Sequence, residues 1–144
     1  MKLTKQTMAE ELQEDVDLLK LLASNPPFND SSGTATKAHS VIPAGKATAS
    51  TNTPFLTLQG GTEALTGVKL TEEVFYIRCY NRKDQSYVSI DQILEMVKEI
   101  MNDKVFLMSG IQNVKTKYEQ TGPELEDQSI GFNFRESRYR LFLL

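Results

Sequence analysis

The amino-acid sequence predicts an α+β protein, with a mostly antiparallel sheet of about four or five strands packed against two helices. Two segments carry apolar residues at helical spacing, several short segments alternate like strands, and one long polar loop lies between them. A length of 144 residues with 40% hydrophobic residues suits one domain around one core. We therefore expect a single domain over 1–144, with the sheet and the second helix in 54–144.

Residues 5–23 are predicted to form the first helix. Apolar side chains recur there every three or four residues, at Met8, Leu12, Val16, Leu19 and Leu22. Thr7 and Glu10 have the spacing of a capping box, which satisfies free N–H groups at a helix start. Asn25-Pro26-Pro27 should end the helix, because proline cannot continue its hydrogen-bond ladder.

The stretch Ser24–Thr53 consists almost entirely of small and polar residues and is predicted to be a long polar loop. Its only large apolar side chains are Phe28, Val41 and Ile42. Loops of this length are usually functional, or are ordered only by a partner. We therefore expect these three side chains to contact a partner or another subunit.

Two features of this loop do not add up to a chemical site. Gly45-Lys46 lacks the earlier glycine of a phosphate-binding loop, since Ser40 stands there. His39 has no carboxylate or cysteine at catalytic spacing, and a catalytic histidine usually has such a partner. We interpret both as ordinary loop residues.

The segments after the loop predict strands and a second helix. Pro54–Leu58 is a short strand, and Val68–Leu70 begins another. Glu73–Arg82 is apolar on both faces, which favours a central position in the sheet. Residues 89–103 form the second helix, because an apolar stripe runs along them at helical period. Ser89 and Gln92 have capping-box spacing at its start.

Two further strands are predicted to close the chain. Residues 114–119 alternate between apolar and charged side chains, which is typical of a half-buried strand. A loop over 122–127 leads to a last strand that begins at Ser129. Its apolar residues change parity between Phe134 and Tyr139, and we expect a bulge or break near 136–138.

Composition excludes several classes of function. Cys79 is the only cysteine, and its place in an apolar strand favours packing as a small hydrophobe. The acidic residues Glu124, Glu126 and Asp127 lack calcium-loop spacing. We expect no catalytic residue, no cofactor and no metal. The polar segment Met1–Glu11 and the lack of a long apolar run predict no signal peptide and no membrane partner.

Basic residues recur on the last two predicted strands, at Lys115, Lys117, Arg135, Arg138 and Arg140. Together they could form a stripe across a hairpin. Two interpretations stay open: an ordinary solvated sheet face, or a surface for a subunit or partner, where charge complementarity fixes orientation. The net charge of −3 argues against a protein that neutralises phosphates.

The order of these elements resembles that of the tail-completion or tail-terminator proteins of long-tailed bacteriophages. The likeness is carried by Leu18–Leu22, Pro54–Leu58, Phe75–Tyr80, Ser89–Met101 and Phe132–Arg140. The resemblance implies a non-enzymatic α+β subunit of a ring, generally a hexamer, that caps the head-proximal end of the tail tube.

The same resemblance implies the partners and the location. The partners would be further copies of the chain, the tail-tube protein, the head-connector protein and DNA that passes through the lumen without sequence-specific binding. The protein would lie in the virion tail, and in the host cytoplasm during assembly. Alternatives are a head-side connector, an α+β adaptor that binds a protein through Ser24–Thr53, and a small enzyme using carboxylates such as Glu72 and Glu73.

Overall fold

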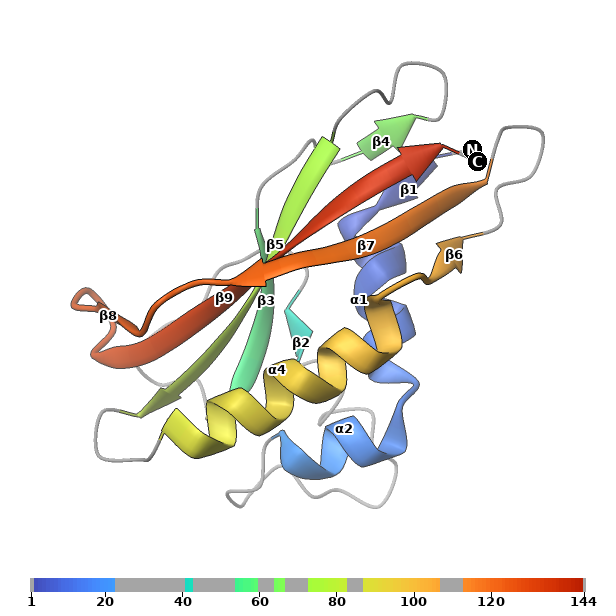
Figure 1. The fold of residues 1–144 in the computed structure, drawn as a ribbon. Helices are drawn as coiled ribbons and strands as arrows, with labels where there is room; N and C mark the ends of the chain where they lie inside the picture. Colours follow the sequence, from blue (N-terminus) through green and yellow to red (C-terminus); the bar gives the residue numbers. More distant parts are fainter. Residues whose placement is uncertain are drawn as a thin grey trace.

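The structure is a computed structural model that describes residues 2–22, 41–42, 54–59, 64–66, 73–82, 87–106 and 113–143 (Figure 1). Its described helices are α1 (Lys5–Gln13), α2 (Val16–Leu21) and α4 (Tyr87–Met101). Its described strands are β1 (Lys2–Thr4), β2 (Val41–Ile42), β3 (Phe55–Gln59), β4 (Ala64–Thr66), β5 (Glu73–Arg82), β6 (Val105–Phe106), β7 (Val114–Thr121), β8 (Leu125–Asp127) and β9 (Phe132–Leu143). The α+β class predicted from the sequence is confirmed.

The main sheet has seven strands in the order β2-β3-β5-β9-β7-β6, with β8 pairing beside this path to β9. β2 runs parallel to β3, so the sheet is mixed. β1 and β4 pair separately. The sequence predicted a mostly antiparallel sheet of about four or five strands, and the structure corrects this to a mixed sheet of seven. The additional strands β2, β6 and β8 were not predicted, because strands of two or three residues leave no alternation to detect.

The strand β5 is central, as predicted, and its register with β9 is continuous from Glu73 opposite Leu141 to Arg82 opposite Phe132. β3 pairs with its other edge. Successive side chains of a strand point to opposite faces. Ile77 and Cys79 accordingly lie in the main core. Tyr80 lies on the other face, in an aromatic cluster formed by Phe55, Tyr80, Phe132 and Phe134. The two faces of β5 are thus both buried.

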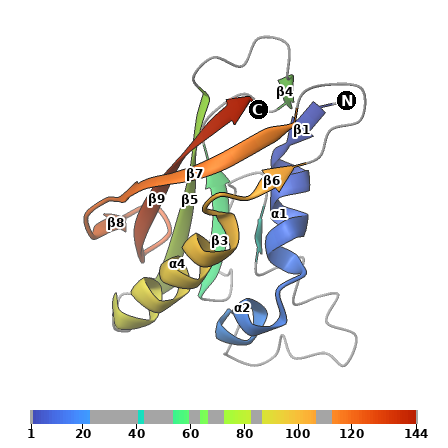
Figure 2. The ribbon, with the colours of Figure 1, turned by 45° about the vertical axis from the view of Figure 1, so that its right-hand side comes forward.

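The three helices pack against one face of the sheet (Figure 2). The main core joins side chains of α1, α2 and α4 to those of β5, β7 and β9, and Tyr139 is its largest fully buried side chain. Lys104, which follows α4, forms an ion pair with Glu11 of α1 at 2.5 Å. The opposite face, which points away from the helices, is called the outer face below.

The predicted helix 5–23 is two helices, because Asp15 interrupts it. The backbone of Asp15 is extended, and its side chain accepts a hydrogen bond of 2.9 Å from the N–H of Leu18. This contact caps α2 at its N-terminus. The apolar spacing survives the break, since Leu12 and Leu22 are both buried.

The start of the first helix at residue 5 is confirmed, whereas the predicted N-caps of both helices and the start of the second helix are corrected. α1 begins at Lys5 and α4 at Tyr87, so Thr7 and Ser89 lie inside their helices and are not N-caps. A capping-box spacing recurs by chance inside amphipathic helices, where the same period places polar residues on one face. The apolar stripe of α4 is buried as predicted, at Ile90, Ile93 and Val97.

The predicted irregularity in the last strand lies on its neighbour instead. β9 is continuous against β5, whereas β7 shifts register between Tyr118 and Gln120, opposite Tyr139 and Arg138. The change of apolar parity arises because β9 buries its two ends on opposite faces. Its first residues belong to the aromatic cluster, and its later ones belong to the main core.

Several sequence predictions lie outside the described residues. They concern Phe28, His39, Gly45-Lys46, the strand at Val68–Leu70 and the loop Ser24–Thr53 apart from Val41–Ile42.

Candidate functional site

The outer face of β7 and β9 carries most of the predicted basic stripe. The register sets Lys115 opposite Phe142 and Lys117 opposite Arg140. The alternate positions, such as Thr116 opposite Leu141, are buried toward the helices. By the same alternation Arg138 shares the face of Arg140. The structure therefore brings Lys115, Lys117, Arg138 and Arg140 together.

Arg135 is not part of this stripe, which corrects the sequence prediction. It stands opposite Cys79 in the pairing with β5, on the face that the helices cover. Its guanidinium donates through Nε to the carbonyl of Gly122 at 2.9 Å and through Nη1 to Asp91 of α4 at 2.6 Å. The stripe predicted by proximity in sequence therefore divides, because residues at odd spacing point to opposite faces.

The cations of the stripe are partly balanced by two carboxylates. Glu119, at the irregular position of β7, forms ion pairs with Arg138 at 3.0 Å and Arg140 at 3.1 Å. Asp103 approaches the ammonium groups of Lys115 at 3.4 Å and Lys117 at 3.3 Å. Within the described residues, each of these two carboxylates is thus shared by two cations of the stripe, in a chain whose net charge is −3.

The electrostatics of Asp103 follow from these contacts. The hydrogen bond from Lys117 lowers the pKa of the Asp103 carboxyl, and the hydrogen bond from Lys115 adds to this effect despite some opposing desolvation. The Asp103 side chain is 48% exposed. Such exposed pairs contribute little stability, so both lysines can exchange this partner for another carboxylate at small cost.

Further along the outer face, Arg78 links the charged region to the aromatic cluster. Its Nε contacts Glu136 at 2.7 Å, its Nη1 donates to the hydroxyl of Tyr80 at 3.1 Å, and its guanidinium lies 4.6 Å from the ring centroid of Phe134. Burial by itself lowers the pKa of Arg78, but the hydrogen bonds to Glu136 and Tyr80 outweigh it and raise the pKa.

The aromatic cluster closes this end of the outer face. The rings of Phe55 and Tyr80 stack with centroids 4.9 Å apart, and Phe132 meets Phe55 edge to face at 5.9 Å. Such ring pairs add about 0.5–1.5 kcal/mol beyond their buried area. Ile42, one of the loop residues predicted to contact a partner, lies in this region of its own chain. Ile42 packs against the cluster and is half-buried.

Val41 is not available to a partner, which corrects its assignment as an interface residue. Its side chain is 0% exposed within the main core. Its carbonyl accepts a hydrogen bond from the Gln13 side chain at 3.1 Å, and its strand pairs with β3. A β-branched residue in a paired strand is buried by that pairing, which composition alone could not reveal.

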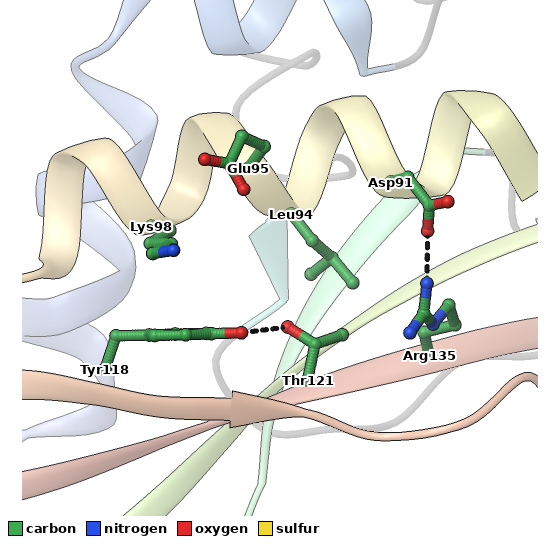
Figure 3. Close-up of a pocket in the computed structure, with 7 residues that line it drawn as sticks. All are labelled: Asp91, Leu94, Glu95, Lys98, Tyr118, Thr121 and Arg135. Atoms are coloured by element: carbon green, nitrogen blue, oxygen red, sulfur yellow. Dashed lines mark hydrogen bonds and ion pairs between the residues drawn. The ribbon is translucent and has the colours of Figure 1, made fainter.

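A cavity of about 270 Å³ lies between α4 and the strands β7 and β9 (Figure 3). It is lined by Asp91, Leu94, Glu95, Lys98, Tyr118, Thr121 and Arg135. The hydroxyl groups of Tyr118 and Thr121 are 2.8 Å apart, and the ammonium of Lys98 lies 4.5 Å from the Tyr118 ring centroid. The Tyr118–Thr121 contact lies within β7, whereas Lys98 over the Tyr118 ring and the ion pair of Asp91 with Arg135 cross the cavity and hold α4 against the sheet.

A second concavity, the α2–α4 groove, has a volume of about 350 Å³ and is lined by Leu21, Gln92, Glu95, Met96 and Glu99. Leu21 and Met96 are apolar, whereas Glu95 and Glu99 lie one helical turn apart and are both exposed. Sequence reasoning missed this groove. Its lining comes from two helices that are distant in the sequence, and helical spacing alone does not predict which helices meet.

The described residues offer few elements of reactive chemistry. No group of three or more His, Cys, Asp or Glu residues among them could hold a metal ion. Cys79 is buried, and burial raises the pKa of its thiol. Within the described part of the chain, no helix is both long and apolar enough to cross a membrane.

Comparisons with family models, with curated proteins and with solved structures find no match to this chain.

Proposed function

We propose that the protein is a tail-terminator, or tail-completion, subunit of a long-tailed bacteriophage. It is a structural protein without enzymatic activity. Copies of the chain form a ring, of six subunits by the pattern of the family that it resembles. The ring caps the head-proximal end of the tail tube and joins it to the head. The subunit thus works in the virion, after assembly in the host cytoplasm.

The observation that best supports a role in assembly is the outer face of β7 and β9. No described helix packs on it, and it combines four basic side chains with the ring of Phe142, which is 38% exposed. Aromatic and arginine side chains are enriched in protein interfaces. Charged groups around them set the orientation of the partner.

Because the edges of the sheet are short or covered, we expect subunits to associate through side chains rather than by adding strands to one another's sheets. β2 and β6 have two residues each, and short edge strands discourage pairing with another chain. On the edge of β7 that faces away from β9, the N–H of Thr116 donates to the carbonyl of Lys104. The N–H of Tyr118 on the same edge donates to the side chain of Asn102. The outer edge of β7 is therefore covered by its own chain up to Tyr118.

The net charge suits the passage of DNA. A chain with a net charge of −3 repels phosphates at long range. A ring of such subunits would let DNA slide through its lumen, because tight binding to DNA requires that many phosphates be neutralised by cations.

Size-exclusion chromatography with light scattering, combined with negative-stain imaging, tests this function. The purified protein should form rings alone or with tail-tube protein, and it should stop the growth of tail tubes. Binding to a head connector without binding to tail tubes would indicate a head-side connector instead. A protein that stays monomeric at high concentration and ignores tail tubes would refute the proposal and favour an adaptor.

A further inference from the structure

We propose that Phe142 of one subunit inserts into the α2–α4 groove of the next, so that subunits associate head to tail. The occupant of the groove is thus a second copy of this chain. The inference rests on the proposed function, because it names the two surfaces through which copies of the chain meet in the ring.

The inserting element is Phe142 with the cations around it. Phe142 is 38% exposed and is one of three large hydrophobic residues that are exposed in the part of the chain that the structure describes. Lys115 lies directly opposite it on β7, while Arg140 on its own strand and Lys117 share its face. The three cations Lys115, Lys117 and Arg140, called the collar below, therefore lie beside the apolar ring of Phe142.

The receiving element has the complementary character. Leu21 and Met96 provide the apolar lining of the groove, and Glu95 and Glu99 provide negative charge. Its volume of about 350 Å³ lies in the range of pockets that enclose small organic groups, about 300–1,000 Å³. Methionine adapts its shape to an incoming ring, because its chain is unbranched and flexible.

The charges of the two elements favour their contact. Within the described residues, Glu95 and Glu99 have no ion-pair partner, and the two lysines of the collar share one carboxylate, that of Asp103. The lysines of the collar contact Asp103 at 3.3–3.4 Å, at the long end of ion-pair distances. Docking would give both carboxylates of the groove a cationic partner, which favours the correct orientation of the subunits.

The two elements cannot meet within one molecule. In both views of the ribbon, the C-terminal end of β9 lies at one end of the molecule and α2 lies at the other (Figures 1 and 2). A contact between different surfaces of two copies is heterologous. Such contacts generate a closed ring when the rotation between subunits closes, and a filament when it does not.

A mixing experiment with two half-defective variants tests the head-to-tail arrangement. Phe142→Glu removes the inserting element, and the double variant Glu95→Lys/Glu99→Lys removes the receiving one. Each alone should weaken self-association at least about thirtyfold, the loss typical of an interface hot spot. An equimolar mixture should form a heterodimer and nothing larger, because each variant keeps one intact surface. Light scattering after size exclusion measures the mass.

Leu125→Glu is the matched control, because Leu125 is a similarly exposed hydrophobic residue, 45% exposed, on β8. This variant should assemble like the wild type. Circular dichroism should show that all variants are folded, as expected for exposed positions. A charge exchange gives a second test: adding Lys115→Glu/Lys117→Glu to the receiving-surface variant should restore rings.

The outcomes separate this inference from the proposed function. Rings of the wild type that persist in Phe142→Glu would overturn the inference and leave the tail-terminator function standing. The same holds if Phe142→Glu abolishes binding of DNA, or of tail-tube protein, while the ring stays intact. A wild-type protein that never assembles, even on tail tubes, would overturn both.

Discussion

Replacing Tyr139 with phenylalanine should stabilise the protein. Tyr139 is 0% exposed, and its ring stacks on Phe75 with centroids 5.4 Å apart and an angle of 16°. It also meets the ring of Tyr118 edge to face at 5.6 Å. The hydroxyl is buried and has no hydrogen-bond partner among the described residues. Phenylalanine keeps both ring contacts and removes only this hydroxyl.

The expected gain follows from the cost of the unpaired hydroxyl. A buried polar group without a partner costs about 1–3 kcal/mol. The vacated space offsets part of the gain, at about 24 cal/mol per Å³ of cavity that the surroundings fail to fill. We therefore expect Tyr139→Phe to raise the free energy of unfolding by about 1 kcal/mol, or Tm by about 4 °C for a domain of this size.

Urea unfolding of the wild type and two variants measures this effect. The midpoint of Tyr139→Phe should rise with an unchanged slope, since the surface exposed on unfolding stays the same. Tyr118→Phe is the matched control: its hydroxyl lies 2.8 Å from that of Thr121. That variant should lose about 1 kcal/mol. A loss of more than about 0.5 kcal/mol in Tyr139→Phe would show that its hydroxyl is hydrogen-bonded, and would refute the reasoning.

The pH dependence gives an independent check on the same side chain. Burial raises the pKa of Tyr139, and the nearby Tyr118 and Glu95 raise it further. Below the unfolded pKa of about 10, the Tyr139 phenol is protonated in both states and the free energy of unfolding is unaffected by its ionisation. As the pH rises from there toward the folded pKa, only the unfolded state loses this proton, so the free energy of unfolding falls. The advantage of Tyr139→Phe should therefore grow above about pH 10, by up to about 1.4 kcal/mol per pH unit. An advantage that stays constant would contradict the burial of a phenol.

Three further variants or measurements probe other elements. Asp15→Ala should lower the free energy of unfolding by about 1 kcal/mol in urea titrations, because α2 loses its N-cap, whereas Asp15→Asn should retain most of it. A double-mutant cycle of Arg78→Met and Glu136→Gln should give a coupling of about 0.5–1 kcal/mol that shrinks in high salt; zero coupling at low salt would exclude a stabilising ion pair. Cys79 should resist thiol reagents in the folded protein at pH 8 and react after unfolding in urea, and rapid labelling of the native protein would contradict its burial.

The parts of the fold that the sequence predicted are those with strong periodicity. Glu73–Arg82 is the strand β5 with the predicted bounds, and the apolar stripe of α4 is buried. The break at Asp15 was missed, because one side chain that captures a backbone N–H can end a helix without changing its apolar pattern. The short strands were missed because two or three residues carry no measurable period.

The candidate site was predictable only as a set of residue types. The basic positions on β7 and β9 were found from composition and alternation, and four of the five share the outer face. Arg135 was misplaced because a bulge expected near 136–138 would have set it on the face of Arg138, whereas β9 is continuous there. The α2–α4 groove left no signal in the sequence, since its apolar lining reads as ordinary helix core.

The sequence by itself determined the α+β class, the central character of β5, the amphipathic helix α4 and the burial of Cys79. These follow from hydrophobic periodicity, which acts within a few residues along the chain. Only the tertiary structure decided the strand order, the parallel pairing of β2 and the face on which each cation stands. Pairings between distant segments are chosen by the burial of whole faces together. For that reason the exposed Phe142 and the groove proposed to receive it became visible only in the folded chain.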